Sequence, residues 1–291
     1  MDSIPIVLTT DFGASSPAVG VMKGVILTIN SQANILDLTH QVSPQNVLQG
    51  ARILGGSHGY FPRSAIHVAV VDPGVGTSRQ ALLLTTPHGR FVGPDNGLFS
   101  GVILGYLSES PSADGSVAIP SGCSARALTQ AKYWLDPVSN TFHGRDIFSP
   151  VAAHLSLGIP DSDVGPVVDK IRFLASPQPS IEYSSQGNTI RGEVVQSDHF
   201  GNLITNITAR DLAQAATVTV QIKGREIPGL SKTFHGAAPT VDGELVALIS
   251  SSGYLEIAVT DGSAANYLDS GPGEAVNIHT SHAPDSHSPE S

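Results

Sequence analysis

The stretch AIHVAVVDPGVGTSR, residues 65–79, decides how the first half of the chain is read. It begins as a run of mostly β-branched apolar residues, which predicts a buried strand. Asp72 stands where the strand ends, a glycine-rich turn follows, and Arg79 comes one short loop later. The sequence therefore places a carboxylate and a guanidinium close together at a strand end.

On both sides of this stretch, strand-like and helix-like segments alternate. Helices are predicted over residues 17–30 and 46–61, with Pro17 suited to a helix start. Strands are predicted over residues 4–13, 34–40, 65–76 and 89–97. This order predicts an α/β domain with a mostly parallel sheet, in which ligands bind at the carboxyl ends of strands. Four polar residues fall at such ends: Asp11, His40, Asp72 and Asp95.

The pattern changes in the second half of the chain. Residues 168–189 are rich in Pro, Ser and Gln, and a domain boundary is expected near residue 180. Short β-branched runs with turn signals follow at 190–207, 216–227, 244–259 and 275–280, which indicates an all-β domain. The expected division is an α/β domain over residues 1–180, a smaller β domain over 181–280 and a disordered tail over 281–291.

Composition limits the class of protein. The net charge of −10 over 291 residues disfavours a nucleic-acid partner. Charged residues make up only 14%, which suggests extensive buried surface or subunit contact. The single cysteine, Cys123, allows no intrachain disulfide, and no signal peptide or membrane-spanning run is expected, so a cytoplasmic setting without membrane contact is predicted.

Taken singly, the candidate site residues all have ordinary structural explanations. Asp11 can cap a turn, Arg79 can form a surface ion pair, and His143 can pack where Asp146 favours a helix start. No HExxH motif, paired Cys/His spacing or GxxxxGK[ST] loop is present. No metal is therefore predicted, although a dispersed carboxylate site stays open.

Eight motifs in order carry a family resemblance: TTDFG, VMKGVI, DLTH, VDPGVGT.R, PDNGL, FHGRDIF, DHFGNLITNI and GYLEIAV. They resemble the adenosine-forming S-adenosylmethionine (SAM) hydrolases, also called SAM hydroxide adenosyltransferases, which are related to fluorinase and chlorinase. The resemblance runs from about residue 5 to about residue 280. It implies a Rossmann-like N-terminal domain, a smaller C-terminal β domain, and a homotrimer. SAM, the substrate, would bind between the N-terminal domain of one subunit and the C-terminal domain of its neighbour, with no cofactor.

The resemblance also assigns roles to residues. The catalytic set would be Asp72, Arg79 and His143. Water would attack the ribose 5′ carbon and release adenosine and methionine, with Asp72 accepting the proton and His143 orienting the water or sharing the proton.

Further residues would hold the substrate. Asp11 would meet the ribose hydroxyls, Asp198 the methionine ammonium and Asn202 the adenine edge. Ser251 would contact the methionine end, and the backbone near Val259 would meet adenine. Phe142 would form a wall of the reaction centre, next to Gly144. Ala18 departs from relatives, which often carry an aromatic residue there, so part of the methionine pocket is expected to be looser.

Three other functions remain as alternatives. A halogenase of the same superfamily is disfavoured because Gly144 stands where the fluorinase has a serine and Asp72 where halogenases carry a tyrosine. A non-catalytic SAM-binding protein would not need the whole Asp, Arg and His set. A metal-dependent nucleoside hydrolase would lose activity on chelation.

Overall fold

The computed structural model describes residues 4–108, 111–112, 115–185, 187–213, 215–234 and 244–281. The chain divides into two compact units, Met1–Ala175 and Ser176–Ser291, each with its own core. Their junction falls a few residues before the boundary expected near residue 180. Apart from Ser281, the expected tail lies outside the described residues.

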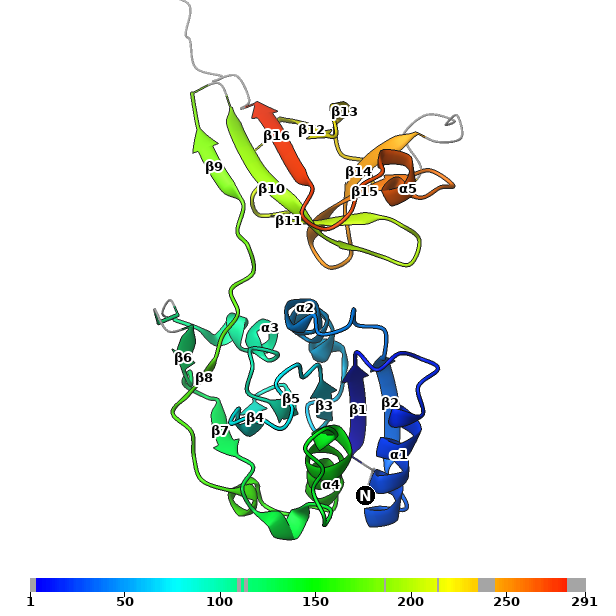
Figure 1. The fold of residues 1–291 in the computed structure, drawn as a ribbon. Coiled ribbons are helices and arrows are strands. Elements are labelled where there is room, and N and C mark those ends of the chain that lie inside the picture. Colours follow the sequence, from blue (N-terminus) through cyan, green and yellow to red (C-terminus); the bar gives the residue numbers. More distant parts are fainter. Residues whose placement is uncertain are drawn as a thin grey trace, which may run out of the picture. The chain divides into compact units, whose positions relative to one another are not determined.

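The N-terminal unit is built on a six-stranded sheet with the order β2-β1-β3-β5-β4-β7 (Figure 1). The strands are β1 (Pro5–Thr10), β2 (Asn34–Thr39), β3 (Ile66–Val70), β4 (Ala81–Thr86), β5 (Gly89–Pro94) and β7 (Ser124–Ala127). β2, β1, β3 and β5 are parallel, as the alternation of strands and helices predicts. β4 and β7 are antiparallel additions that the sequence analysis did not predict.

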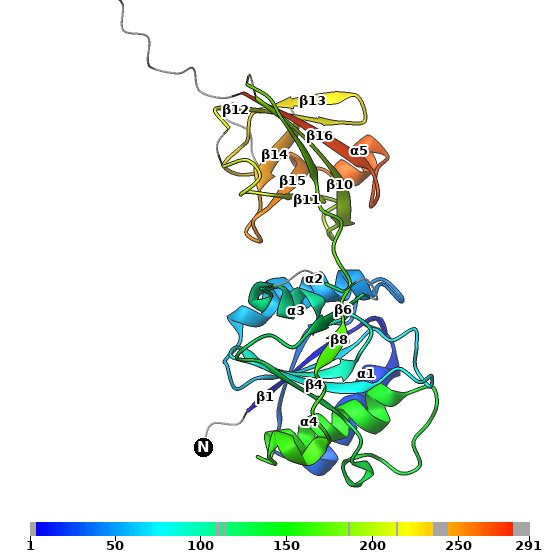
Figure 2. The ribbon, with the colours of Figure 1, turned by 90° about the vertical axis from the view of Figure 1, so that its left-hand side faces the viewer.

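Helices cover both faces of this sheet (Figure 2). On one face lie α1 (Pro17–Ile29) and α4 (Ser149–Ser156), and on the other α2 (Val47–Ser57) and α3 (Ser100–Ile103). The remaining elements of this unit are η1 (His58–Tyr60), η2 (Leu104–Tyr106), β6 (Ser116–Ala118), η3 (Ala131–Tyr133), the π-helical turn η4 (Gly144–Phe148), η5 (Asp161–Val164) and β8 (Lys170–Arg172).

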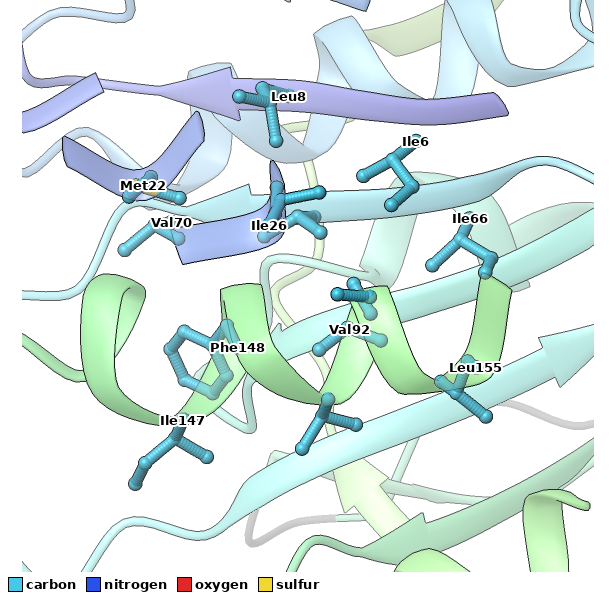
Figure 3. Packing of buried hydrophobic residues seen from close by; sticks show 14 of the residues in the cluster. Ile6, Leu8, Met22, Ile26, Ile66, Val70, Val92, Ile147, Phe148 and Leu155 are labelled. Carbon is cyan, nitrogen blue, oxygen red and sulfur yellow. The ribbon is translucent and has the colours of Figure 1, made fainter. Parts of the chain in front are cut away.

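Local chemistry explains why α1 forms and which side it buries. The Ser16 hydroxyl accepts a hydrogen bond from the Ala18 N–H at the helix start, beside Pro17. Met22 and Ile26, one turn apart, are fully buried. Figure 3 shows them in the same core as Phe148 and the β1 side chains. Fully burying side chains of this size stabilises the fold by about 1.5–3 kcal/mol each.

The C-terminal unit is an antiparallel sheet of eight strands with the order β13-β12-β16-β10-β11-β15-β14, and β9 pairs with β10. Its strands are β9 (Ser180–Tyr183), β10 (Asn188–Ser197), β11 (Leu203–Thr208), β12 (Thr217–Ile222), β13 (Arg225–Pro228), β14 (Leu245–Ile249), β15 (Tyr254–Val259) and β16 (Ala275–Ser281). One short helix, α5 (Ala264–Leu268), interrupts the all-β pattern that the sequence predicts. Ser263 caps this helix by accepting from the Asn266 N–H.

The polar residues predicted at strand ends lie there. Asp11, His40 and Asp95 directly follow β1, β2 and β5, and Asp72 comes two residues after β3. Because these four strands are parallel, their carboxyl ends share one edge of the sheet. Within the described ranges, no helix is long and apolar enough to cross a membrane.

Candidate active site

The turn after β3 brings Arg79 back toward Asp72. The Val75 N–H donates to the Asp72 carbonyl at 3.2 Å, and the Thr77 hydroxyl donates to the Gly74 carbonyl at 2.6 Å. The Thr77 hydroxyl oxygen in turn accepts from the Arg79 N–H at 3.3 Å. The turn therefore closes on itself and fixes the backbone from which Arg79 extends.

Asp72 and Arg79 form a bidentate ion pair. Arg79 Nε donates to Asp72 Oδ1 at 2.9 Å, and Nη2 donates to Oδ2. The two side chains are buried, with exposed fractions of 4% for Asp72 and 9% for Arg79. The guanidinium also lies over the Phe148 ring, 5.4 Å from its centroid. An ion pair this well shielded is held in one geometry by the surrounding fold.

His143 completes this cluster and takes a defined tautomer. Arg79 Nη2 lies 2.7 Å from His143 Nδ1. A guanidinium only donates, so Nδ1 accepts and the imidazole proton resides on Nε2. Burial and the positive charge of Arg79 lower the pKa of His143, against the opposing charges of Asp72 and Asp146. At neutral pH the imidazole is therefore neutral, with Nε2–H as its donor.

Asp146 holds the loop that carries His143. Its carboxylate is buried and accepts from the Ser139 N–H at 2.8 Å and from Arg145 Nε at 2.6 Å. The Arg145 guanidinium lies 5.3 Å from the centroid of the Phe142 ring. Sequence reasoning considered Asp146 only as a helix-start residue; its hydrogen bond to a backbone N–H seven positions earlier depends on the tertiary fold.

Gly76 shows how closely the turn between Asp72 and Arg79 approaches the loop that carries His143. Its φ is +76°, and a Cβ there would overlap the backbone oxygen of Asn140, which lies on the same loop as His143. The glycine-rich turn thus packs directly against the His143 loop. This contact explains the glycine more specifically than a turn preference does.

Phe142 and Gly144 lie in an apolar corner beside this cluster. The Phe142 ring packs edge-on against Phe12, with 5.7 Å between centroids. A Cβ at Gly144 would meet Met22 Sδ at 3.3 Å and the Phe142 ring at 3.4 Å. The corner joins the loop after β1 to the His143 loop.

Asp11 lies on the same sheet edge but outside the hydrogen-bonded cluster. Its Oδ2 accepts from the Gln45 N–H at 2.8 Å. Among the described residues, no hydrogen bond or ion pair joins Asp11 to Asp72, Arg79 or His143. The structure thus brings together the three predicted catalytic residues and leaves Asp11 as a separate acidic group at the same edge.

The C-terminal unit holds the other predicted binding residues. In the turn between β10 and β11, Asp198 Oδ1 accepts from the N–H groups of Phe200 and Asn202 at 2.9 and 2.8 Å. Asp198 Oδ2 accepts from Asn202 Nδ2 at 2.9 Å. Asp198 therefore has a local role in holding this turn and Asn202, and its contact with methionine stays a prediction.

Ser251 and Val259 occupy opposite ends of β15. Ser251 lies in the turn before the strand, whereas Val259 is its last residue. The register pairs Leu203 with Ile257, so the Asn202 turn lies at the Val259 end. Within this unit the structure brings Asn202 and Val259 to the same end and leaves Ser251 at the other.

Glu256 is a polar residue that sequence reasoning did not single out. It lies in β15 with 5% of its surface exposed. Burial and the nearby negative charge of Asp198 raise the pKa of Glu256, while a hydrogen bond from Asn202 opposes them. Its place as the one carboxylate within the largely apolar stretch GYLEIAV was the available signal.

The described residues contain no group of three or more His, Cys, Asp or Glu side chains arranged to hold a metal ion. The clustered chemistry consists of a carboxylate, a guanidinium and a neutral imidazole. Such a set can accept a proton, donate a hydrogen bond and orient a small polar molecule.

Comparison with known families covers most of the chain. The model of the SAM hydroxide adenosyltransferase N-terminal domain matches residues 6–165, and that of the C-terminal domain matches residues 192–277. Among solved structures, a conserved protein from Thermotoga maritima superposes with a TM-score of 0.80 at 35% identity, covering 94% of this chain and 99% of the other.

Curated relatives carry two kinds of names. A protein from Salinispora arenicola named (R)-S-adenosyl-L-methionine hydrolase is 37% identical, over 96% of this chain and 99% of its own length. One of the same name from Thermus thermophilus is 36% identical, over 94% and 99%. A fluorinase from an Actinoplanes species is more distant, at 27% identity over 87% and 90%.

Proposed function

The chain belongs to the SAM hydroxide adenosyltransferase family, and from this membership we propose that it is an enzyme that hydrolyses S-adenosyl-L-methionine to adenosine and L-methionine. The observation that carries the proposal is the buried cluster in which Arg79 bonds both Asp72 and His143. This cluster lies at the carboxyl edge of the parallel strands, where α/β sheets bind ligands.

The cluster suits activation of one water molecule. Asp72 uses one lone pair of each oxygen for Arg79, which leaves further lone pairs to accept a proton from water. His143 offers Nε2–H as a donor, because Nδ1 is engaged by Arg79. We assign proton acceptance to Asp72 and orientation of the water oxygen to His143. Of the two roles that the sequence left open for His143, this one requires no rearrangement of its bond to Arg79.

The reaction makes modest demands on the site. Water attacks the ribose 5′ carbon, the bond from that carbon to the sulfonium sulfur breaks, and methionine leaves as a neutral thioether. The leaving group therefore needs no acid catalyst. The site must hold water in line with the breaking bond and accept its proton as the new bond forms. Asp72 takes that proton late in the attack, while it stays bonded to Arg79.

Further residues are proposed to hold the substrate. Asp11 binds the ribose hydroxyls, Phe142 and Gly144 wall the reaction centre, and Ser251 meets the methionine end. Asp198 contacts the methionine ammonium, and Asn202 and the backbone at Val259 meet adenine. The more open surface at Ala18 loosens part of the methionine pocket. The family relationship, the position of Asp11 at the end of β1 and the packing of Phe142 against Phe12 support these assignments.

We further propose a cytoplasmic homotrimer without a cofactor or metal, whose N-terminal domain is Rossmann-like. Each substrate site would combine the α/β domain of one subunit with the β domain of its neighbour. The division of the predicted binding residues between the two units supports this arrangement.

A halogenase is the second candidate, favoured by the fluorinase relatives. Asp72 argues against it, because a carboxylate accepts a hydrogen bond from water, whereas a halide has no proton to donate. Gly144 supplies no hydroxyl that would hold a halide in compensation.

The test is product analysis of purified protein with SAM, with and without a chelator, in water enriched in oxygen-18. Labelled adenosine and unlabelled methionine, unaffected by chelation, are expected. A halogenated nucleoside in chloride buffer would favour the halogenase, loss of activity on chelation would favour a metal-dependent hydrolase, and binding without any product would leave only SAM binding.

A further inference from the structure

A row of contacting polar side chains next to the Asp11 loop has no part in the mechanism above. It begins at the surface, where Lys23 Nζ of α1 lies 2.6 Å from Asp37 Oδ2 of β2. Asp37 Oδ1 lies 2.9 Å from His40 Nε2, and His40 Nδ1 lies 3.0 Å from the Thr10 hydroxyl at the end of β1. The DLTH motif thus connects two neighbouring strands at the edge that carries the candidate site.

The last side chain of this row, Thr10, lies next to the loop that carries Asp11. The Thr10 hydroxyl oxygen accepts from the Phe12 N–H at 3.2 Å, and this bond links the residues directly before and after Asp11. The His40 carbonyl accepts from the Gly13 N–H at 2.8 Å. Side chain and backbone of His40 therefore fix both ends of the short segment 10–13, in which Asp11 and Phe12 lie.

The contact between Thr10 and His40 does not depend on one proton arrangement. The Thr10 oxygen accepts from the Phe12 N–H, and it can still either donate its proton to His40 Nδ1 or accept from it, because a hydroxyl has one proton and two lone pairs. His40 Nε2 lies 2.9 Å from Asp37 Oδ1 as an ion pair, without the alignment of a hydrogen bond. Burial raises the pKa of Asp37, but Lys23 and His40 outweigh it and lower that pKa overall. An ionised Asp37 favours a proton on the neighbouring Nε2, and the bond between Thr10 and His40 is kept in either case.

Burial makes the arrangement rigid. Thr10 is fully buried, and the His40 side chain is only 10% exposed. Phe12, at the far end of the segment, packs against Phe142 beside the His143 loop. A shift of the segment would therefore move the Asp11 carboxylate and disturb the wall of the reaction centre together.

We propose that His40, acting through the Thr10 hydroxyl, is a positioning residue that holds Asp11 in the orientation required to bind the ribose hydroxyls. The proposal rests on the function proposed above, since it takes Asp11 as the ribose-binding group. His40 and Thr10 make no contact with substrate in this scheme. Together with the Gln45 N–H, which donates to Asp11 Oδ2 at 2.8 Å, they set the angle at which the carboxylate meets the diol.

The test uses two substitutions at one buried position. Thr10→Val keeps the shape of the side chain and removes the hydroxyl, whereas Thr10→Ser keeps the hydroxyl. Each is made in the wild type and in an Asp11→Ala background. The readouts are the KM for SAM and the dissociation constant of adenosine measured by calorimetry, which needs no turnover. Thermal unfolding of each variant checks the fold.

Thr10→Val should raise both constants by about tenfold, and Thr10→Ser by less than about threefold. In the Asp11→Ala background, Thr10→Val should cause little further increase in either constant, because the carboxylate that Thr10 positions is already absent. His40→Leu should behave like Thr10→Val and provides a second variant if the latter folds poorly.

Three results separate this inference from the proposed function. Unchanged constants for Thr10→Val and His40→Leu, or effects that add fully to that of Asp11→Ala, would overturn the positioning role. Unchanged adenosine affinity in Asp11→Ala itself would overturn the ribose assignment and, with it, this inference. Absence of SAM hydrolysis, together with adenosine binding that depends on the Thr10 hydroxyl through Asp11, would refute the proposed reaction and support the positioning role.

Discussion

Replacement of Arg79 by lysine tests whether the cluster works through the shape of the guanidinium or only through its charge. Arg79 donates two hydrogen bonds to Asp72 and one to His143. A lysine ammonium keeps the positive charge but lacks the planar fork, so it cannot reproduce all three. Losing two charge-assisted bonds in a buried site removes about 3–6 kcal/mol of interaction.

Part of that loss is offset by the attraction that the lysine charge retains. We expect kcat/KM for SAM to fall by about a hundredfold to a thousandfold, which corresponds to about 3–4 kcal/mol. The KM alone should move by less than about threefold, because the proposed scheme assigns ribose binding to Asp11 and not to Arg79. Initial rates of adenosine formation, measured by chromatography, and circular dichroism to verify the fold are the assays.

The matched control is Arg191→Lys. Arg191 also pairs with a carboxylate, that of Glu182, but both side chains are more than half exposed. The same chemical change there should leave rates and the unfolding temperature nearly unchanged. A folded Arg79→Lys protein with near wild-type kcat/KM would refute the reasoning, because charge alone would then suffice.

Four further results are expected. His67 is buried, and among the described residues neither of its ring nitrogens has a hydrogen-bond partner; burial, assisted by the charge of His58, lowers its pKa to about 4. The unfolded chain binds a proton there below about pH 6.5, so stability should fall as pH drops from 6.5 toward 4, by about 3 kcal/mol in urea titrations, and His67→Phe should remove that loss. Gly76→Ala should lower both activity and unfolding temperature, since its Cβ would overlap a backbone oxygen, whereas Gly74→Ala, with 3.4 Å to its nearest neighbour, should be far milder. Asp72→Ala should nearly abolish adenosine formation while calorimetry still detects SAM binding. Mixing inactive Asp72→Ala and Asn202→Ala proteins under subunit exchange should restore some activity, and no recovery after proven exchange would argue for sites within one chain.

The strands and helices that position the site were predictable because their signals are local. The apolar runs that form β1 and β3 are each followed closely by an aspartate. Pro17, followed by apolar residues at helical spacing, predicts α1. β4 was missed although its residues ALLLTT form an apolar run. It forms an antiparallel hairpin with β5, and a periodic strand–helix alternation gives no indication of such an insertion.

The site itself was only partly accessible to sequence reasoning. The pairing of Asp72 with Arg79 follows from a short turn, but the contact of Arg79 with His143 joins positions 64 residues apart. Family resemblance, not spacing, suggested that contact. The roles of Asp146, which fixes a loop through the Ser139 N–H, and of His40, which reaches Thr10 from the next strand, depend on tertiary packing that no local pattern encodes.

The geometry changes the reason why water should be preferred over a halide. A lone Asp72 carboxylate would repel an anion about 4 Å away by roughly 4 kcal/mol at an effective dielectric constant near 20. Arg79 is bound to that carboxylate by two hydrogen bonds, so the pair has almost no net charge and most of the repulsion cancels. Bonds to Asp72 and His143 occupy Nε and both protons of Nη2, and Nη1 donates to the Gln80 carbonyl at 3.4 Å. The donor that the cluster offers is then Nε2–H of His143, from which water and a halide can both accept. Water can in addition donate to the free lone pairs of Asp72, which a halide cannot do. Selectivity for water therefore rests on the acceptors that Asp72 supplies more than on charge.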